Sequence, residues 1–149
     1  MPENNIALVD DTWGLDRHLE LWLGDAGTRV TRFWSIADAI VALERERFPV
    51  VIVALRTCLG KDDGGAEHAQ VPTRDCVETC AYMIRRIKKE GYPNQQTPIL
   101  VADVVHPTND GMYPNARDRL VEAGALDYCN LIEGIEPLVH KIKPLIPAR

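Results

Sequence analysis

The chain has 149 residues, 46% of them hydrophobic and 26% charged, a composition typical of one globular domain with a single core. Its net charge of −5 and pI near 5.3 argue against nucleic acid as a partner, because binding to phosphate backbones needs a basic face. Since there is neither a membrane-length apolar run nor a signal-peptide pattern, we expect a cytoplasmic protein with no membrane partner and reduced cysteines.

In chain order, the first elements alternate strand and helix. Residues 5–10 and 28–34 predict strands, because each is a short run of apolar or β-branched residues. Residues 15–25 between them predict a helix, in which four apolar residues recur at helical spacing: Leu15, Leu19, Trp22 and Leu23. A second helix is predicted over residues 36–47, after the capping residue Ser35. Its expected buried stripe consists of Ile36, Ile40, Val41 and Leu43.

The second half of the chain continues the alternation. Residues 49–55 are continuously apolar, which is typical of a strand covered on both faces. The polar stretch over residues 56–75 is too long for an ordinary connection and predicts an extended loop. The remaining predicted elements are a helix, a strand, a helix and a strand, over residues 76–91, 97–105, 116–125 and 126–131. Three prolines after residue 133 predict a short or irregular last helix.

This alternation predicts a single α/β domain over residues 1–149, with a five-stranded parallel sheet and helices on both of its faces. The flavodoxin-like strand order 2-1-3-4-5 suits a chain of this length. In such sheets the functional site lies beyond the carboxyl ends of the strands, beside the first strand. Asp10 and Asp11 directly follow that strand.

Four segments carry a resemblance to a known family: "IALVDDT", "FPVVIVALR", "TPILVADVV" and "LVEAGALDYCN". Together they resemble the receiver domains of response regulators, the CheY-like family, over nearly the whole chain. The resemblance implies two acids that hold Mg²⁺, a phosphoacceptor Asp ending strand 3, a Thr or Ser ending strand 4, and a Lys after strand 5. Asp10 and Asp11 match the acids, and Tyr128 matches the family's switch-like aromatic residue.

Three reactive positions depart from the family pattern. Ala54 occupies the phosphoacceptor position, or Leu55 if the register slips by one residue. Asp103 occupies the hydroxyl position and Leu131 the Lys position. We therefore predict no catalytic residue and no enzyme activity, and the chain resembles a degenerate pseudo-receiver that lacks the phosphoacceptor Asp.

The remaining acids need an explanation, because neighbouring carboxylates repel one another unless a cation lies among them. One hypothesis is a weakly bound Mg²⁺ held by Asp10, Asp11 and Asp103, and another is no cofactor at all. In the latter case Arg56 or Lys61 acts as an internal counter-ion, since an Arg side chain is suited to bridging carboxylates. In a third hypothesis, Asp103 points to solvent. The missing acid at Ala54 favours the internal cation.

The expected function is a stand-alone receiver-like signalling module of two-component signal transduction, or a phosphorelay, that is not phosphorylated at the usual position. Its partner is expected to be a histidine kinase or another signalling protein. The resemblance also implies a homodimer through the surface of helix 4, strand 5 and helix 5. Two alternatives are a response regulator phosphorylated noncanonically, at Asp10, Asp11 or Asp103, and a small-ligand-binding or enzymatic domain on the same fold.

Overall fold

Five parallel strands form one sheet in the order β2-β1-β3-β4-β5, which confirms the predicted topology. The computed structural model describes residues 4–11, 14–24, 27–60, 75–104 and 115–146. The strands are β1 (Asn5–Val9), β2 (Arg29–Phe33), β3 (Val51–Ala54), β4 (Ile99–Asp103) and β5 (Asp127–Asn130). The helices are α1 (Leu15–Leu23), α2 (Ile36–Leu43), α3 (Cys76–Ile87), α4 (Ala116–Ala123) and α5 (Glu136–Ile142), and a 3₁₀ turn, η5 (Lys143–Leu145), follows α5.

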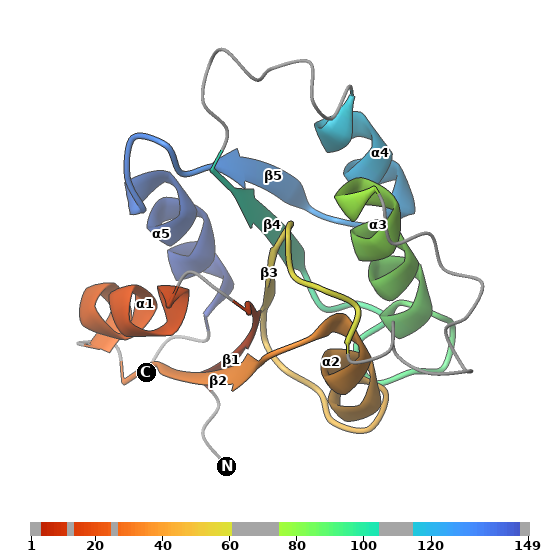
Figure 1. Cartoon of the computed structure of the whole chain (residues 1–149). Helices are drawn as coiled ribbons and strands as arrows, with labels where there is room; N and C mark the ends of the chain where they lie inside the picture. The colour runs from red at the N-terminus through yellow and green to blue at the C-terminus, as the bar shows by residue number, and fades with distance from the viewer. Residues whose placement is uncertain (1–3, 12–13, 25–26, 61–74, 105–114, 147–149) are drawn as a thin grey trace.

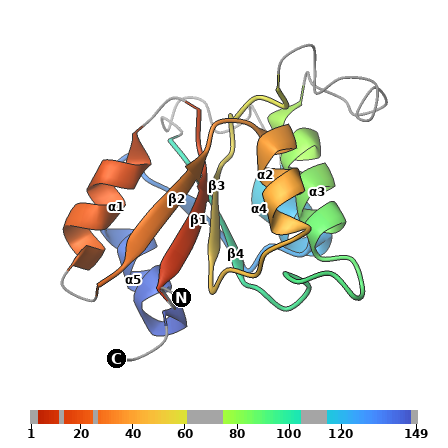
Figure 2. The ribbon, with the colours of Figure 1, turned by 90° about the horizontal axis from the view of Figure 1, so that it is seen from below.

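The sheet lies between two layers of helices. Helices α1 and α5 cover one face, and α2, α3 and α4 cover the other, as Figures 1 and 2 show from two directions. Each strand is therefore buried on both faces wherever it lies inside the sheet, and β3 and β4 are buried at every residue. This agrees with the continuous apolar run that predicted β3.

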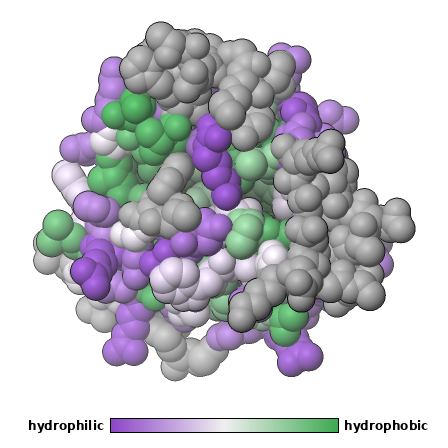
Figure 3. Space-filling model, in the orientation of Figure 1, coloured by the Kyte–Doolittle hydropathy of each residue, from purple (hydrophilic) through white to green (hydrophobic). Residues whose placement is uncertain are grey.

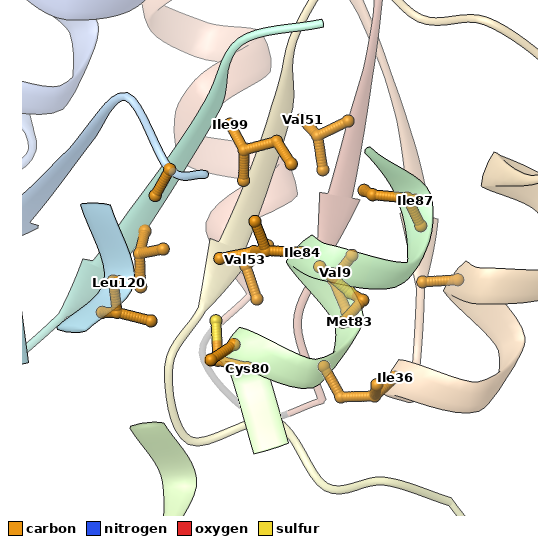
Figure 4. Packing of buried hydrophobic residues seen from close by; sticks show 14 of the residues in the cluster. Val9, Ile36, Val51, Val53, Cys80, Met83, Ile84, Ile87, Ile99 and Leu120 are labelled. Carbon is orange, nitrogen blue, oxygen red and sulfur yellow. The ribbon is translucent and has the colours of Figure 1, made fainter. Parts of the chain in front are cut away.

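Two hydrophobic clusters form the core, one on each face of the sheet. On the face of α2, α3 and α4, Val9, Val51 and Val53 pack against Met83 and Ile84 of α3 (Figure 4). On the other face, Leu8 and Ile52 pack with Leu19 of α1 and Leu138 of α5. The alternation of side chains along each strand sends neighbouring residues into opposite clusters, so both helical layers are anchored to the same strands.

One predicted core position is wrong. Val41 is 54% exposed, because Ile36, Ala39, Ile40 and Leu43 already fill the buried stripe of α2 and Val41 lies beside it. Trp22 is also exposed, while Leu15, Leu19 and Leu23 form the buried face of α1.

Two predicted helices end earlier than expected, and the buried residue Asn94 gives the reason for α2. Its side-chain amide donates to the carbonyl oxygens of Leu43 and Glu46, at 2.6 and 2.8 Å, and its Oδ1 accepts from the backbone N–H of Phe48 at 3.0 Å. The backbone that follows α2 is thus held in a turn rather than in a helix to residue 47. Helix α3 ends at Ile87, where Lys88 caps it.

Residues 61–74 of the predicted loop lie outside the described residues. Among those that are described, no helix is long and apolar enough to cross a membrane.

Candidate functional site

The carboxyl ends of the strands bring the predicted site residues to one edge of the sheet (Figure 1). Asp10 and Asp11 follow β1, while Ala54 and Asp103 are the last residues of β3 and β4. The register pairs Val9 with Val53 and Ala54 with Ala102, so the ends of β1, β3 and β4 lie side by side. The topology therefore gathers these residues, as expected for a sheet of this order.

Asp103 is fully buried and is held by three donors. Nε of Arg56 lies 3.1 Å from its Oδ1, which also accepts from the backbone N–H of Val104 at 2.9 Å. The carboxylate is 0% exposed, whereas the Arg56 side chain is 30% exposed and reaches it from the rim. Asp103 therefore does not point to solvent, because the geometry supplies it with a cation and a backbone donor.

Tyr128 is the third donor to Asp103. Its phenol oxygen lies 3.3 Å from Oδ2 of the carboxylate. Burial raises the pKa of Tyr128 to about 12, and both the negative charge of Asp103 and the hydrogen bond to it act in the same direction. The phenol thus stays protonated at neutral pH and remains a donor, so β5 is connected to the end of β4 through this side chain.

Asp10 has a different cation, Arg32 of β2, which the sequence analysis did not identify. Arg32 donates from Nε to the backbone carbonyl of Asp10 at 2.8 Å, and its guanidinium lies 3.7 Å from the Asp10 carboxylate. It also lies 3.5 Å from Asp16 and stacks on the ring of Trp34 at 3.7 Å. The parallel pairing of β1 with β2 could have indicated this contact, since it places Arg32 opposite Leu8, two residues before Asp10.

The carboxylate of Asp10 also accepts from the backbone N–H of Leu15, at 3.2 Å. Leu15 is the first residue of α1, so this bond satisfies one of the free N–H groups at the start of the helix. Asp10 is therefore a fully buried structural acid that joins β1, β2 and α1.

Asp11 is the least satisfied of the three acids. Its Oδ2 accepts from the backbone N–H of Cys58 at 2.9 Å, while its Oδ1 is buried with no hydrogen-bond partner. Burial raises the pKa of the Cys58 thiol, and the hydrogen bond to Asp11 and its charge raise it further. Asp11 thus ties β1 to the segment that follows β3.

The residues present do not fit the three-carboxylate Mg²⁺ site that the resemblance implies. Ala54 has no oxygen to offer, both oxygens of Asp103 already face protein donors, and Asp10 faces Arg32 and Leu15. Within the part of the chain that the structure describes, no three acid, His or Cys side chains are grouped to hold a metal ion. The hypothesis that Asp10, Asp11 and Asp103 bind Mg²⁺ weakly stays untested, and a titration can test it.

Leu131 follows β5, and its backbone N–H donates to the carbonyl of Asp103 at 2.7 Å. Its buried side chain belongs to the core cluster on the α1 and α5 face, so the position implied for a Lys is apolar here. Lys61, the second candidate counter-ion, lies outside the described residues.

Solved structures of receiver domains share this fold. The chemotaxis response regulator CheY4 of Vibrio cholerae has a TM-score of 0.64 at 16% identity, over 95% of this chain and 97% of that chain. A Francisella response-regulator receiver domain has a TM-score of 0.62 at 12% identity, over 96% of both chains. The receiver domain of the sensor histidine kinase PA1611 of Pseudomonas aeruginosa was solved with magnesium in its active-site cleft. It has a TM-score of 0.61 at 20% identity, over 96% of this chain and 97% of that chain. These likenesses show the fold.

No family model matches the chain, and no curated protein matches it in sequence.

Proposed function

We propose that this protein is a receiver-like signalling module that acts through contacts with other proteins and is not phosphorylated at the usual acceptor position. The observation that carries the proposal is Ala54, which ends β3 beside the acids of β1 on a receiver fold. A methyl side chain has no nucleophilic oxygen, so no acyl phosphate forms there. The four free cysteines fit the reducing cytoplasm in which we place the protein.

Two internal cations support the proposal. Arg56 lies against Asp103 and Arg32 lies against Asp10, so the protein itself offsets charge that Mg²⁺ would offset in a phosphoryl-transfer site. An ion pair of this kind holds the strand ends in one arrangement without ligand or phosphoryl group. In the proposed function, the module therefore presents one constant surface to its partner, such as a histidine kinase.

The proposed partner surface comprises α4, β5 and α5. Asp127 of β5 lies between Arg117 of α4, at 3.0 Å, and Lys141 of α5, with which it also forms an ion pair. Val121 on α4 and Leu126, directly before β5, are exposed apolar residues. Fixed charges beside exposed apolar groups suit a protein partner, and they also suit a second copy of the chain.

Incubation with acetyl phosphate and Mg²⁺, followed by intact-mass measurement, tests the central claim. We expect no species heavier by one phosphoryl group, while an active receiver domain treated in parallel gains it. A phosphorylated species would overturn the claim that the module acts without a phosphoryl group and would favour the noncanonical alternative. Variants Asp10→Asn, Asp11→Asn and Asp103→Asn would then locate the group, as the noncanonical alternative requires.

Sedimentation velocity tests the homodimer. If the surface of α4, β5 and α5 joins two copies, Leu126→Glu shifts the protein towards monomer and the control Leu21→Glu, at a still more exposed leucine on α1, does not. A monomeric wild-type protein at all concentrations would remove the homodimer from the proposal and leave the hetero-partner.

A further inference from the structure

A pocket of about 410 Å³ lies next to the candidate site, and the acids Asp10, Asp11 and Asp103 do not line it. It is formed by α1, the residue after β4 and the connection from β5 to α5, and the two helices cover the same face of the sheet (Figure 1). Its lining residues come from these three places: Leu15, His18, Val104, Leu131, Gly134 and Ile135. Hydrophobic side chains also gather over the β5–α5 connection on the face shown in Figure 3.

The pocket has a buried apolar floor and a more exposed rim. Leu15 and Leu131 are buried members of the core cluster, so the floor is a fixed part of the protein. Val104 is 39% exposed, and Ile135 is half-buried. Small-molecule sites commonly have volumes of about 300 to 1,000 Å³ and a mainly apolar lining with few polar groups. This pocket matches that description in size and in lining.

The rim of the pocket carries an imidazole and a carboxylate. Among the described lining residues, His18 is the ionisable one, three residues after Leu15 on the same face of α1. The carboxylate of Glu136 lies close over Gly134. A Cβ atom added to this glycine would be 2.5 Å from Oε2 of Glu136. The imidazole and the carboxylate offer a donor and an acceptor, and the negative charge of the carboxylate disfavours an anionic ligand.

We propose that this pocket binds a small, uncharged, mainly apolar molecule that carries one hydrogen-bonding group. The apolar body lies on Leu15 and Leu131, and the polar group faces His18 and Glu136. This inference goes beyond the proposed signalling function and does not depend on it. The pocket adjoins the end of β4, since the backbone N–H of Leu131 donates to the carbonyl of Asp103.

Two fluorescent probes test the proposal on the full chain. N-phenylnaphthylamine is neutral and has one N–H group, and anilinonaphthalenesulfonate is the same amine with a negative charge added. We expect saturable binding of the neutral probe at one site per chain, at least ten-fold tighter than binding of the anionic probe. Val104→Lys should weaken binding of the neutral probe at least ten-fold, because it places a charge at the mouth of the pocket.

Val41→Lys is the matched control, because Val41 is an exposed valine on α2, outside the pocket. It should leave the affinity unchanged, and unfolding curves should show both variants folded. The proposal is overturned if the neutral probe does not saturate, if Val104→Lys binds as wild type does, or if the anionic probe binds as tightly. An affinity that falls as protein concentration rises would assign the pocket to contacts between copies and would also overturn it.

Discussion

The Nε atom of Arg56 lies 3.1 Å from Oδ1 of Asp103, a carboxylate that is fully buried at the end of β4. The acid occupies the position that the receiver resemblance gives to a hydroxyl residue, and the cation follows Ala54 by two positions. A buried carboxylate without a partner is costly, so each residue accounts for the presence of the other. The candidate site is therefore organised by charge pairs internal to the chain.

Removal of Arg56 should destabilise the fold. Arg56→Ala leaves the buried Asp103 without its cation, and we expect the free energy of unfolding to fall by about 1 to 3 kcal/mol, less than for a wholly buried pair because Arg56 reaches solvent. Urea unfolding measures the change. In the background of Asp103→Asn the same substitution should cost less, because no charge is then stranded. Equal costs in the two backgrounds would show that the pair is not coupled.

Tyr128 should titrate with a pKa near 12, as burial, the charge of Asp103 and the bond to it require. At a pH of about 11 its phenol should still be mostly protonated, when an exposed tyrosine is mostly ionised. Because the folded-state pKa is raised, the stability linked to this group is complete below about pH 10 and is lost as pH rises through 12. NMR of tyrosine-labelled protein follows the titration.

The signal of Tyr128 is identified by its absence from Tyr128→Phe. Asp103→Asn should lower the pKa of Tyr128, because it removes the negative charge that opposes ionisation of the phenol. An unchanged pKa in that variant would show that burial alone raises it and that the contact with Asp103 contributes nothing.

Topology and the acid positions were predictable from the sequence, whereas the ion-pair partners were only partly so. The apolar run of residues 49–55 specifies a covered strand, and the strand order then places Asp10 near Asp103. Arg32 was missed because its contact with Asp10 depends on the register between β1 and β2, which hydrophobic pattern alone does not specify. The turn at Asn94 was missed for a similar reason, since its bonds join residues 46 to 51 positions apart.

Mg²⁺ should bind weakly or not at all. Arg56 and Arg32 already lie against Asp103 and Asp10, and their positive charges would repel a divalent cation. Calorimetric titration of the wild-type protein should show no binding at millimolar concentrations. The double variant Ala54→Asp with Arg56→Ala adds a carboxylate and removes a cation, so it should bind more tightly than wild type. Millimolar or tighter binding by the wild-type protein that disappears in Asp11→Ala would contradict the internal counter-ion interpretation.

Asp127 should stabilise the fold more at neutral pH than in acid. Burial opposes ionisation of this carboxyl, but the hydrogen bonds from Lys141 and from the Tyr128 N–H, with the charges of Arg117 and Lys141, outweigh it and lower its pKa. Its contribution is therefore present above the unfolded-state pKa of about 3.9 and is lost as pH falls through the lower folded-state value. Asp127→Asn should cost about 1 kcal/mol at neutral pH and less near pH 3.

Urea unfolding at the two pH values measures this difference, with Glu122→Gln as an exposed control on α4 that should cost little at either pH. A cost of Asp127→Asn that is independent of pH would mean that the residue acts through shape or hydrogen bonding and not through its charge.

Asn94 should be among the most sensitive polar positions outside the candidate site. Its buried side chain bonds to the carbonyls of Leu43 and Glu46 and to the N–H of Phe48, and its Oδ1 also accepts from the Thr97 hydroxyl at 2.9 Å. Asn94→Ala leaves these groups without partners, and we expect a loss of about 2 to 4 kcal/mol in unfolding free energy. The exposed neighbour Gln96→Ala should change stability by less than about 0.5 kcal/mol. Similar losses in the two variants would show that the turn before β3 does not depend on Asn94.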